Sequence, residues 1–194
     1  MIEKFIDYKK CIPSLYVNTV YDIDFKSLYE LGYRVIFFDL DNTLISYKET
    51  TPNKQSILFI ASLKNMGFEV MIVSNNSNKK RVKSASEILG LDYINFALKP
   101  LKRGFKKAMK KLGSKYKYDQ VVEVGDQILT DVYGSKRMKF YTVLVDAIDH
   151  KTEIFATRLN RKREKNILNK IKKKDIDSYN KYLLKYEENN LWVK

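Results

Sequence analysis

The chain has 194 residues, 44% of them hydrophobic, which suits one folded domain with an appendage, and its net charge of +14 favours anionic partners. A single cysteine, Cys11, excludes an intramolecular disulfide and a cysteine metal cluster, and a single histidine, His150, excludes a histidine-rich metal site. No apolar run reaches about 18 residues, so we expect a cytoplasmic protein without a transmembrane helix.

Helices and strands are predicted to alternate along most of the chain. Glycines and a proline mark helix boundaries, at Gly32, Pro52, Gly67, Gly90 and Gly113. In chain order, the predicted elements are a helix at 23–31, a strand at 34–38, a helix at 52–67, a strand at 68–73, a helix at 78–89, a strand at 93–96, a helix at 102–112, a strand at 120–124, a short helix after Asp131 and a strand at 140–145. This alternation predicts an α/β fold with a doubly wound, Rossmann-like parallel sheet of about five strands.

The C-terminal part is predicted to be helical and strongly basic. Residues 151–174 carry ten Lys and Arg against Glu153 and Glu164, a net charge of +8. Two apolar stripes on this segment are out of phase, so we expect a break or two faces; they are Phe155 with Leu159, and Ile167 with Leu168 and Ile171. Later apolar residues are expected to dock back on the core: Tyr179, Tyr182, Leu183, Leu184, Tyr186 and Trp192. The predicted parts are an N-terminal segment packed on the core, the core itself and a basic helical extension, at 1–33, 34–150 and 151–194.

Polar side chains follow each of the first four predicted strands where the strand ends. They are Asp39 and Asp41, then Ser74 and Asn75, then Lys99, then Asp126 and Asp131. Because the carboxyl ends of parallel strands share one edge of a sheet, we expect these side chains to meet there. Carboxylates suit Mg²⁺, a serine hydroxyl with backbone amides suits phosphate oxygens, and a lysine offsets phosphoryl charge. The pattern predicts a magnesium and phosphate site.

These residues resemble, in order, the four motifs of the haloacid dehalogenase (HAD) superfamily of phosphatases. The resemblance covers residues 34–145, and its motifs are Asp39-Leu40-Asp41-Asn42-Thr43 after an apolar strand, Ser74, Lys99, and Gly125-Asp126 through Asp131. It implies that Asp39 is a nucleophile that forms an aspartyl-phosphate and that Asp41 is the general acid and base. Mg²⁺ would be held by the Asp39 and Asp126 carboxylates and by the backbone carbonyl of Asp41.

The resemblance also assigns the phosphate-binding residues. Ser74 and Lys99 would hold the phosphoryl group, with Asn75 nearby, and Asp131 would orient Lys99 or a metal-bound water. Simpler interpretations stay open from the residues alone. Ser74 and Asp131 could each cap a helix, and Lys99 could be one more lysine of a lysine-rich chain.

The spacing of the motifs leaves no room for a cap domain, which HAD enzymes of small metabolites usually carry. The interval from Asp41 to Ser74 holds one helix and one strand, and so does the interval from Ser74 to Lys99. We therefore expect an uncapped, open site, which suits a large substrate or a phosphate presented at a surface.

A narrower resemblance is to the YqeG-like, subclass IIIA phosphatases, which are similar to the mitochondrial-type phosphatidylglycerophosphate phosphatases. It covers residues 12–173 and rests on Asp-Leu-Asp-Asn-Thr-Leu, Val-Ser-Asn-Asn, Lys-Pro, Gly-Asp-Gln-x-x-Thr-Asp and Thr157-Arg158-x-Asn160-Arg161. It implies a lipid phosphomonoester as substrate, with Arg158 and Arg161 at its head group or diester phosphate. Alternatively, these arginines are solvated or pair with Glu153 and Glu164.

Other functions remain open. The basic residues at 102–117 and 151–174 favour contact with the anionic inner face of a membrane, but they also suit a nucleic-acid or ribonucleoprotein-associated protein on a HAD scaffold, or a merely solubilising surface. A phosphatase of a soluble phosphometabolite or nucleotide, and a HAD fold that keeps its metal without turnover, are further alternatives.

Overall fold

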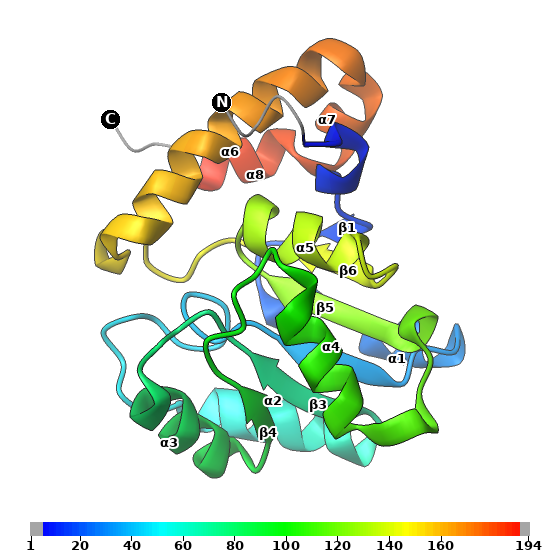
Figure 1. The fold of residues 1–194 in the computed structure, drawn as a ribbon, viewed down its shortest axis with the longest axis vertical. Coiled ribbons are helices and arrows are strands. Elements are labelled where there is room, and N and C mark those ends of the chain that lie inside the picture. Colours follow the sequence, from blue (N-terminus) through cyan, green and yellow to red (C-terminus); the bar gives the residue numbers. More distant parts are fainter. Residues whose placement is uncertain (1–5, 191–194) are drawn as a thin grey trace.

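The computed structural model describes residues 6–190, which include a six-stranded sheet with every neighbouring pair of strands parallel. The strands run in the order β1-β6-β5-β2-β3-β4 across the sheet (Figure 1). Their bounds are β1 (Leu15–Tyr16), β2 (Val35–Phe38), β3 (Glu69–Val73), β4 (Asp92–Ile94), β5 (Val121–Gly125) and β6 (Tyr141–Leu144). The predicted α/β fold is confirmed, and β2 to β6 are the five predicted strands.

Strand β1 is an addition that the sequence did not predict. It is two residues long, which is too short for any periodicity to show. Its Leu15 pairs with Val143 of β6, far along the chain, so no local pattern reports the pairing. The N-terminal segment therefore extends the sheet as well as packing on it.

Strand β2 forms the centre of the sheet because its side chains suit burial on both faces. Val35 and Phe37 point into one hydrophobic cluster, Ile36 and Phe38 point into another, and all four are buried. A continuous run of branched and aromatic residues is typical of a parallel strand that is covered on both sides.

Helices cover both faces of the sheet, as a doubly wound fold requires. Side chains of α1, α2 and α3 pack in the cluster that contains Ile36 and Phe38, and α4 packs in the cluster that contains Val35 and Phe37. The helices are α1 (Phe25–Glu30), α2 (Lys54–Asn65), α3 (Lys79–Leu89), α4 (Lys102–Lys111), α5 (Tyr133–Lys136), α6 (Phe155–Lys174), α7 (Ile176–Tyr182) and α8 (Leu184–Asn190).

The C-terminal helices pack against one edge of the sheet (Figure 1). Of the two alternatives expected for the basic helix, a break or two faces, the structure has the second: α6 is one continuous helix with its two apolar stripes on different faces. The stripe at Ile167, Leu168 and Ile171 is buried, whereas Phe155 and Leu159 are exposed. Among the described residues, no helix combines the length and apolar content needed to cross a bilayer.

Apolar residues of α7, of α8 and of the link between them dock on the core, as predicted for most of them. Those that are buried are Tyr179, Leu183 and Tyr186, and Tyr182 is half-buried. Leu184 is exposed, so its predicted docking is wrong, and Trp192 lies outside the described residues.

The short helix expected after Asp131 begins earlier than predicted. A wide, π-type helical turn spans Ile128–Val132 and leads directly into α5, so Asp131 lies inside the helical segment. Its carboxylate reaches back to accept a hydrogen bond from the backbone N–H of Gln127 at 3.0 Å. Asp131 thus stabilises the start of this turn from within it.

The sheet topology changes direction at β2. The chain runs outward from β2 through β3 and β4, and then returns to β5 and β6 on the other side. Phe38 pairs with Ile72 of β3 and with Val124 of β5, so the carboxyl ends of the three strands lie level. Ligands of open α/β sheets bind at such a point, and Asp39 is the first residue beyond it.

Candidate active site

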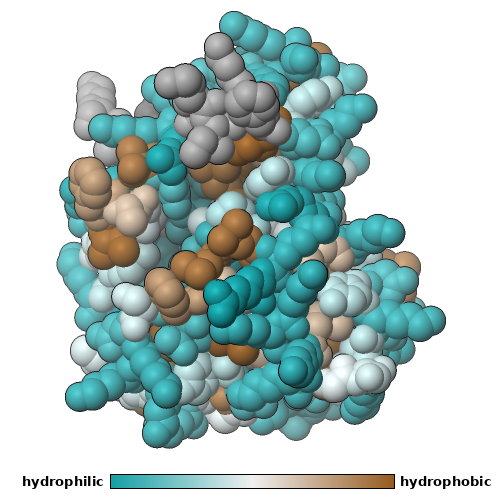
Figure 2. Space-filling view, viewed as in Figure 1, coloured by the Kyte–Doolittle hydropathy of each residue, from teal (hydrophilic) through white to brown (hydrophobic). Residues whose placement is uncertain are grey.

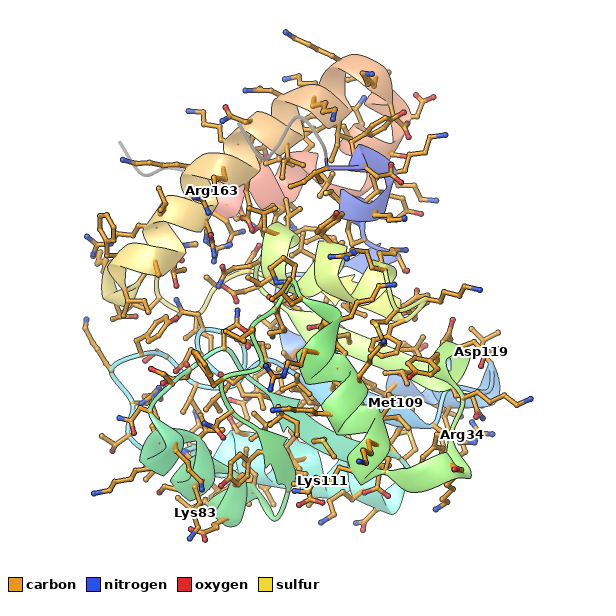
Figure 3. The ribbon with its side chains drawn as sticks, viewed as in Figure 1. Arg34, Lys83, Met109, Lys111, Asp119 and Arg163 are labelled. Atoms are coloured by element: carbon orange, nitrogen blue, oxygen red, sulfur yellow. The ribbon has the colours of Figure 1, made fainter. Side chains whose placement is uncertain are left out.

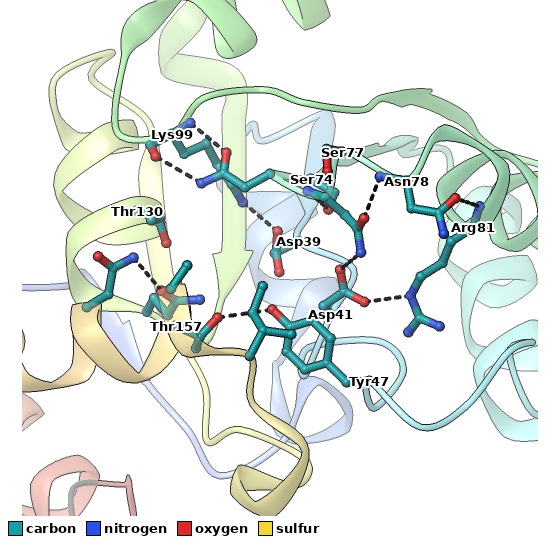
Figure 4. Close-up of a pocket in the computed structure, with 16 residues that line it drawn as sticks. Asp39, Asp41, Tyr47, Ser74, Ser77, Asn78, Arg81, Lys99, Thr130 and Thr157 are labelled. Atoms are coloured by element: carbon teal, nitrogen blue, oxygen red, sulfur yellow. Dashed lines mark hydrogen bonds and ion pairs between the residues drawn. The ribbon is translucent and has the colours of Figure 1, made fainter.

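A cavity of about 370 Å³ opens at the carboxyl edge of the sheet (Figure 4). Five of the predicted site residues line it: Asp39, Asp41, Ser74, Asn75 and Lys99. The start of α6 forms one wall through Ile154, Ala156, Thr157 and Asn160. The described residues contain no cap domain between the motifs, as predicted, and the C-terminal extension lines part of the cavity.

Lys99 lies at the acidic centre of the site. Its Nζ atom is 2.8 Å from Oδ1 of Asp39, 2.6 Å from Oδ1 of Asp131 and 3.8 Å from Oε1 of Glu123, and its side chain is almost fully buried. Burial alone would lower the pKa of Lys99, but the charges of Asp131, Asp39 and Glu123 raise it above its ordinary value. The lysine is therefore a permanent cation beside Asp39.

The surroundings of Asp39 disfavour its ionised form. Burial raises the pKa of the Asp39 carboxyl well above its ordinary value; Lys99 opposes this effect, and the carboxylates of Asp131, Asp126 and Asp41 add to it. More negative charge converges on this point than one lysine offsets. A further cation would favour the ionised form of Asp39.

Asp41 is held by two donors that the sequence did not predict. Nε of Arg81 donates to its Oδ1 atom at 2.8 Å, and Nδ2 of Asn76 donates to its Oδ2 atom at 2.7 Å (Figure 4). Arg81 also donates to the backbone carbonyl of Ser46 at 2.8 Å. The next residue, Asn42, takes a left-handed backbone conformation with φ of 64°, which asparagine tolerates better than most residues. The turn of the chain at Asn42 follows Asp41 directly.

Ser74 and Asn75 follow β3 and fix the loops at this edge of the sheet. Ser74 is buried, and its hydroxyl accepts from the backbone N–H of Asn76 at 3.1 Å. Asn75 exchanges two hydrogen bonds with the Lys99 backbone: its Nδ2 donates to the carbonyl at 2.9 Å, and its Oδ1 accepts from the N–H at 2.6 Å. These bonds occupy the Asn75 amide, so its phosphate contact stays a prediction, while its hold on Lys99 is a structural finding.

Asp126 is fully buried and is paired with Arg161. Nη2 of Arg161 donates to Oδ2 of Asp126, and the Thr43 hydroxyl lies 3.4 Å from Oδ1. Arg161 also donates to the Asp126 carbonyl at 2.7 Å and to the Tyr186 hydroxyl at 2.6 Å. A further bond from its Nε reaches Oε1 of Glu153 at 3.0 Å. All of these groups are buried, so α6 and α8 are tied to the strand end that carries Asp126.

The predicted substrate contact of Arg161 is therefore not supported by its position. Its guanidinium points inward and is enclosed by Asp126, Glu153 and Glu164, which is the pairing that the sequence left as an alternative. The physical reason is the phase of α6, because Arg161 lies on the buried face of this helix. Arg158 lies on the exposed side.

The oxygen donors at this edge fit a hard divalent cation. Within residues 6–190, no group of three or more His, Cys, Asp or Glu side chains is arranged to hold a metal by itself. Magnesium rarely needs such a group, because it keeps several waters and takes one or two carboxylates. Asp39 lines the cavity, and the excess negative charge there favours a cation. Asp126 lies outside the lining with its Oδ2 atom on Arg161, so the ligand set of Asp39, Asp126 and the Asp41 carbonyl stays a prediction.

Comparison with known proteins identifies the family. A family model described as mitochondrial PGP phosphatase matches residues 1–149. The probable phosphatase YqeG of Bacillus subtilis strain 168 is 36% identical over 174 residues, which span 90% of this chain and 96% of that protein. The chain belongs to the PGP phosphatase family. This confirms the resemblance to YqeG-like HAD phosphatases.

Solved structures resemble the chain more distantly. YfnB of Bacillus subtilis, solved with magnesium, is 12% identical and covers 58% of this chain and 86% of its own, with a TM-score of 0.48. A HAD phosphatase of Thermococcus onnurineus is 16% identical, with the same coverage and a TM-score of 0.47. Similarity at this level is too low to indicate a function within the PGP phosphatase family.

The glycine before Asp126 has a packing reason in this family member. A Cβ atom on Gly125 would overlap the carboxyl group of Asp131, so only glycine lets that side chain approach β5. The Gly-Asp pair and the later Asp131 of the fourth motif are thus parts of one contact. That contact brings Asp131 to Lys99.

Several residues around the site were missed from the sequence. Arg81 and Asn76 hold Asp41, Oε1 of Glu123 lies 3.8 Å from Nζ of Lys99, and the Tyr186 hydroxyl donates to the Asp126 carbonyl. A signal existed for Glu123, since an acid within an otherwise apolar buried strand is rare without a partner. None existed for Arg81, which follows two lysines at the start of α3 and looks like part of a solvated face.

Glu164 should make stability depend on pH. Burial raises its pKa to about 7, against the opposing charge of Arg161. The folded chain then binds this proton more tightly than the unfolded chain, whose carboxyl has the ordinary value of 4.5, so stability falls as pH rises from 4.5 to 7. The full effect is at most about 3 kcal/mol.

Urea unfolding at pH 5 and pH 8 tests this prediction. The wild type is expected to lose more stability between the two values than Glu164→Gln, in which the group cannot titrate. Parallel pH profiles for the two proteins would show that Glu164 keeps an ordinary pKa.

Proposed function

We propose that the chain is a Mg²⁺-dependent phosphomonoester hydrolase that works through an aspartyl-phosphate on Asp39. The observation that carries this proposal is the position of Lys99, 2.8 Å from Asp39 and 2.6 Å from Asp131 at the edge of the cavity. A buried cation beside a carboxylate that lines the cavity offsets the charge that develops on a transferring phosphoryl group.

The first half of the reaction forms the covalent intermediate. An Asp39 carboxylate oxygen attacks phosphorus, the bond from phosphorus to the leaving oxygen breaks, and Asp41 donates a proton to that oxygen. Ser74 and Lys99 would hold the phosphoryl oxygens during this transfer. Asp39, Asp126 and the Asp41 carbonyl would hold Mg²⁺, which would supply positive charge to the phosphoryl group.

The second half reverses the role of Asp41. As a carboxylate it takes a proton from water, the water oxygen attacks phosphorus, and the bond to Asp39 breaks to release inorganic phosphate. Arg81 and Asn76 each donate to one Asp41 oxygen, which fixes the carboxylate and leaves the other lone pair of each oxygen free to take a proton. Arg81 therefore acts as a positioning residue for Asp41.

A lipid phosphate, such as phosphatidylglycerophosphate, is the favoured substrate. The family model that matches the chain bears that activity in its description, and no cap domain encloses the site among the described residues. Contact with the anionic inner face of a membrane would follow from such a substrate. The positive charge of the chain is compatible with it.

Removal of metal and a comparison of substrates test the proposal. Chelation with EDTA is expected to abolish hydrolysis of a soluble phosphomonoester, and added Mg²⁺ to restore it. Phosphatidylglycerophosphate in vesicles is expected to show a higher kcat/KM than nucleotides or sugar phosphates.

Two outcomes would contradict different parts of the proposal. Full activity in EDTA would contradict the metal-dependent mechanism. Equal kcat/KM values for all phosphates would contradict the lipid substrate while leaving the phosphatase in place.

A further inference from the structure

Apolar side chains stand exposed where α6 begins, at the wall of the cavity. Phe155 is 82% exposed, Ile154 is 53% exposed and Leu159 is 40% exposed. Ile154 also lines the cavity, so this group reaches its mouth. Figure 2 shows apolar surface gathered over the first turns of α6, on the left of the view. We call Ile154, Phe155 and Leu159 the α6 ridge.

A second apolar group lies on the loop between β4 and α4, which carries Lys99. Phe96 is 55% exposed and Leu101 is 54% exposed. Phe96 adopts a positive φ of 47°, which is uncommon for an aromatic residue. In Figure 2 the apolar surface over this loop runs through the centre of the view, apart from that over α6. We call Phe96 and Leu101 the loop ridge.

Both ridges are flanked by cations. Of the ten Lys and Arg at 151–174, eight are exposed: Lys151, Arg158, Lys162, Arg163, Lys165, Lys172, Lys173 and Lys174. Arg163 is labelled on α6 in Figure 3. The two carboxylates of the same segment, Glu153 and Glu164, are buried on Arg161. The exposed charge of this segment is therefore purely positive, and Lys102 and Arg103 adjoin the loop ridge.

We propose that the two ridges and their flanking cations dock the protein on an anionic phospholipid bilayer, with the cavity facing the lipid phosphates. This inference rests on the proposed lipid phosphatase function. The apolar side chains enter the boundary between head groups and acyl chains, and the lysines and arginines meet anionic head groups. Docking in this way brings a phosphate at the membrane surface to Asp39 without an enclosing cap.

The composition of the surface favours a bilayer over nucleic acid. Single-stranded nucleic acid stacks its bases on aromatic rings and gains little from exposed Ile and Leu side chains. The ridges contribute aliphatic side chains at Ile154, Leu159 and Leu101, next to cations without exposed acids on α6. Aliphatic side chains beside cations are the combination that binds an anionic lipid surface.

Vesicle flotation of the full chain tests the docking surface, with phosphatidylcholine vesicles that contain or lack phosphatidylglycerol. The wild type is expected to bind only the anionic vesicles. Phe155→Ser/Leu159→Ser should bind them at least about tenfold more weakly. Lys162→Gln/Arg163→Gln should lose about fivefold in affinity per charge, and the loss should shrink at high salt.

A matched control uses α1, which precedes the amino end of β2, whereas the cavity lies at the carboxyl ends of the strands. Leu31 is 75% exposed and Lys26 is exposed, so Lys26→Gln/Leu31→Ser removes similar groups away from the cavity. This variant should bind vesicles as the wild type does. All variants should keep the wild-type kcat/KM on a soluble phosphomonoester, which shows that they are folded.

The outcomes separate docking from catalysis. Vesicle affinity that is unchanged in both α6 variants, or lowered equally by the α1 control, overturns the docking surface even if lipid phosphates are hydrolysed. A second outcome combines two results: the α6 variants lose vesicle binding, and the wild type hydrolyses no phosphomonoester. This outcome supports the docking surface and overturns the proposed function. Tighter binding of single-stranded RNA than of vesicles, weakened by the same α6 variants, assigns the surface to nucleic acid and overturns the inference.

Discussion

Asp39→Asn is expected to abolish turnover of a soluble phosphomonoester, with kcat reduced by at least about four orders of magnitude. An amide cannot attack phosphorus, and no other carboxylate takes the place of Asp39 at the end of β2. The fold should remain, because the asparagine oxygen can still accept from Lys99. The change also replaces a carboxyl group whose pKa is raised by burial, which means that its ionised form is disfavoured in the folded protein. Without metal, the free energy of unfolding of the variant should therefore be at least as high as that of the wild type.

The matched control is Asp92→Asn. Asp92 lies on β4, pairs with Lys111 and has a side chain that is 60% exposed, so its loss should leave kcat unchanged. Turnover assays of both variants measure kcat, and urea unfolding measures the free energy of unfolding. Asp39→Asn with kcat within about tenfold of the wild type would exclude Asp39 as the nucleophile.

Arg161→Met is expected to have the largest effect on stability, a loss of about 3–5 kcal/mol in the free energy of unfolding. Arg161 is the cation that pairs with the buried carboxylates of Asp126, Glu153 and Glu164. Methionine fills much of the volume of the arginine side chain but leaves these three buried acids without their positive partner. Because Asp126 is also a proposed magnesium ligand, the affinity for Mg²⁺ should change as well.

Urea unfolding with and without Mg²⁺ measures both effects. Arg158→Met, on the exposed side of the same helix, is the control and should change stability by no more than about 0.5 kcal/mol. If Arg161→Met does not fold, Arg161→Lys keeps the charge with fewer hydrogen bonds and should give an intermediate loss. A loss no greater than that of Arg158→Met would mean that the buried pairing contributes nothing.

The fold was predictable where its signal was local. The run of apolar residues at β2 and the polar residues after it indicate a buried strand and its end, and the carboxyl ends of parallel strands must then share an edge. Strand β1 was not predictable, because two residues carry no period and the pairing with β6 is distant in sequence. Helix α6 was predicted, but the phase that buries Arg161 depends on Asp126, which lies on another element.

The site, like the fold, was predictable where its signal was local in the sequence. Motif order brought Asp39, Ser74 and Lys99 to one cavity, since each follows a strand. The hold of Arg81 on Asp41 depends on the path of the loop after β2, which no periodicity describes. Likewise, charge alone could not show that the extension after residue 150 forms a wall of the cavity.

The contacts of Arg161 and Tyr186 with Asp126 bear on the order in which the protein is made. Synthesis proceeds from the N-terminus, so the six strands of the described residues are all made before α6 and α8. During that interval Asp126 lacks both the guanidinium and the phenol that later enclose it. The nascent sheet therefore carries an incomplete acidic edge, and we expect the protein to acquire its final active-site geometry only after α8 has been synthesised.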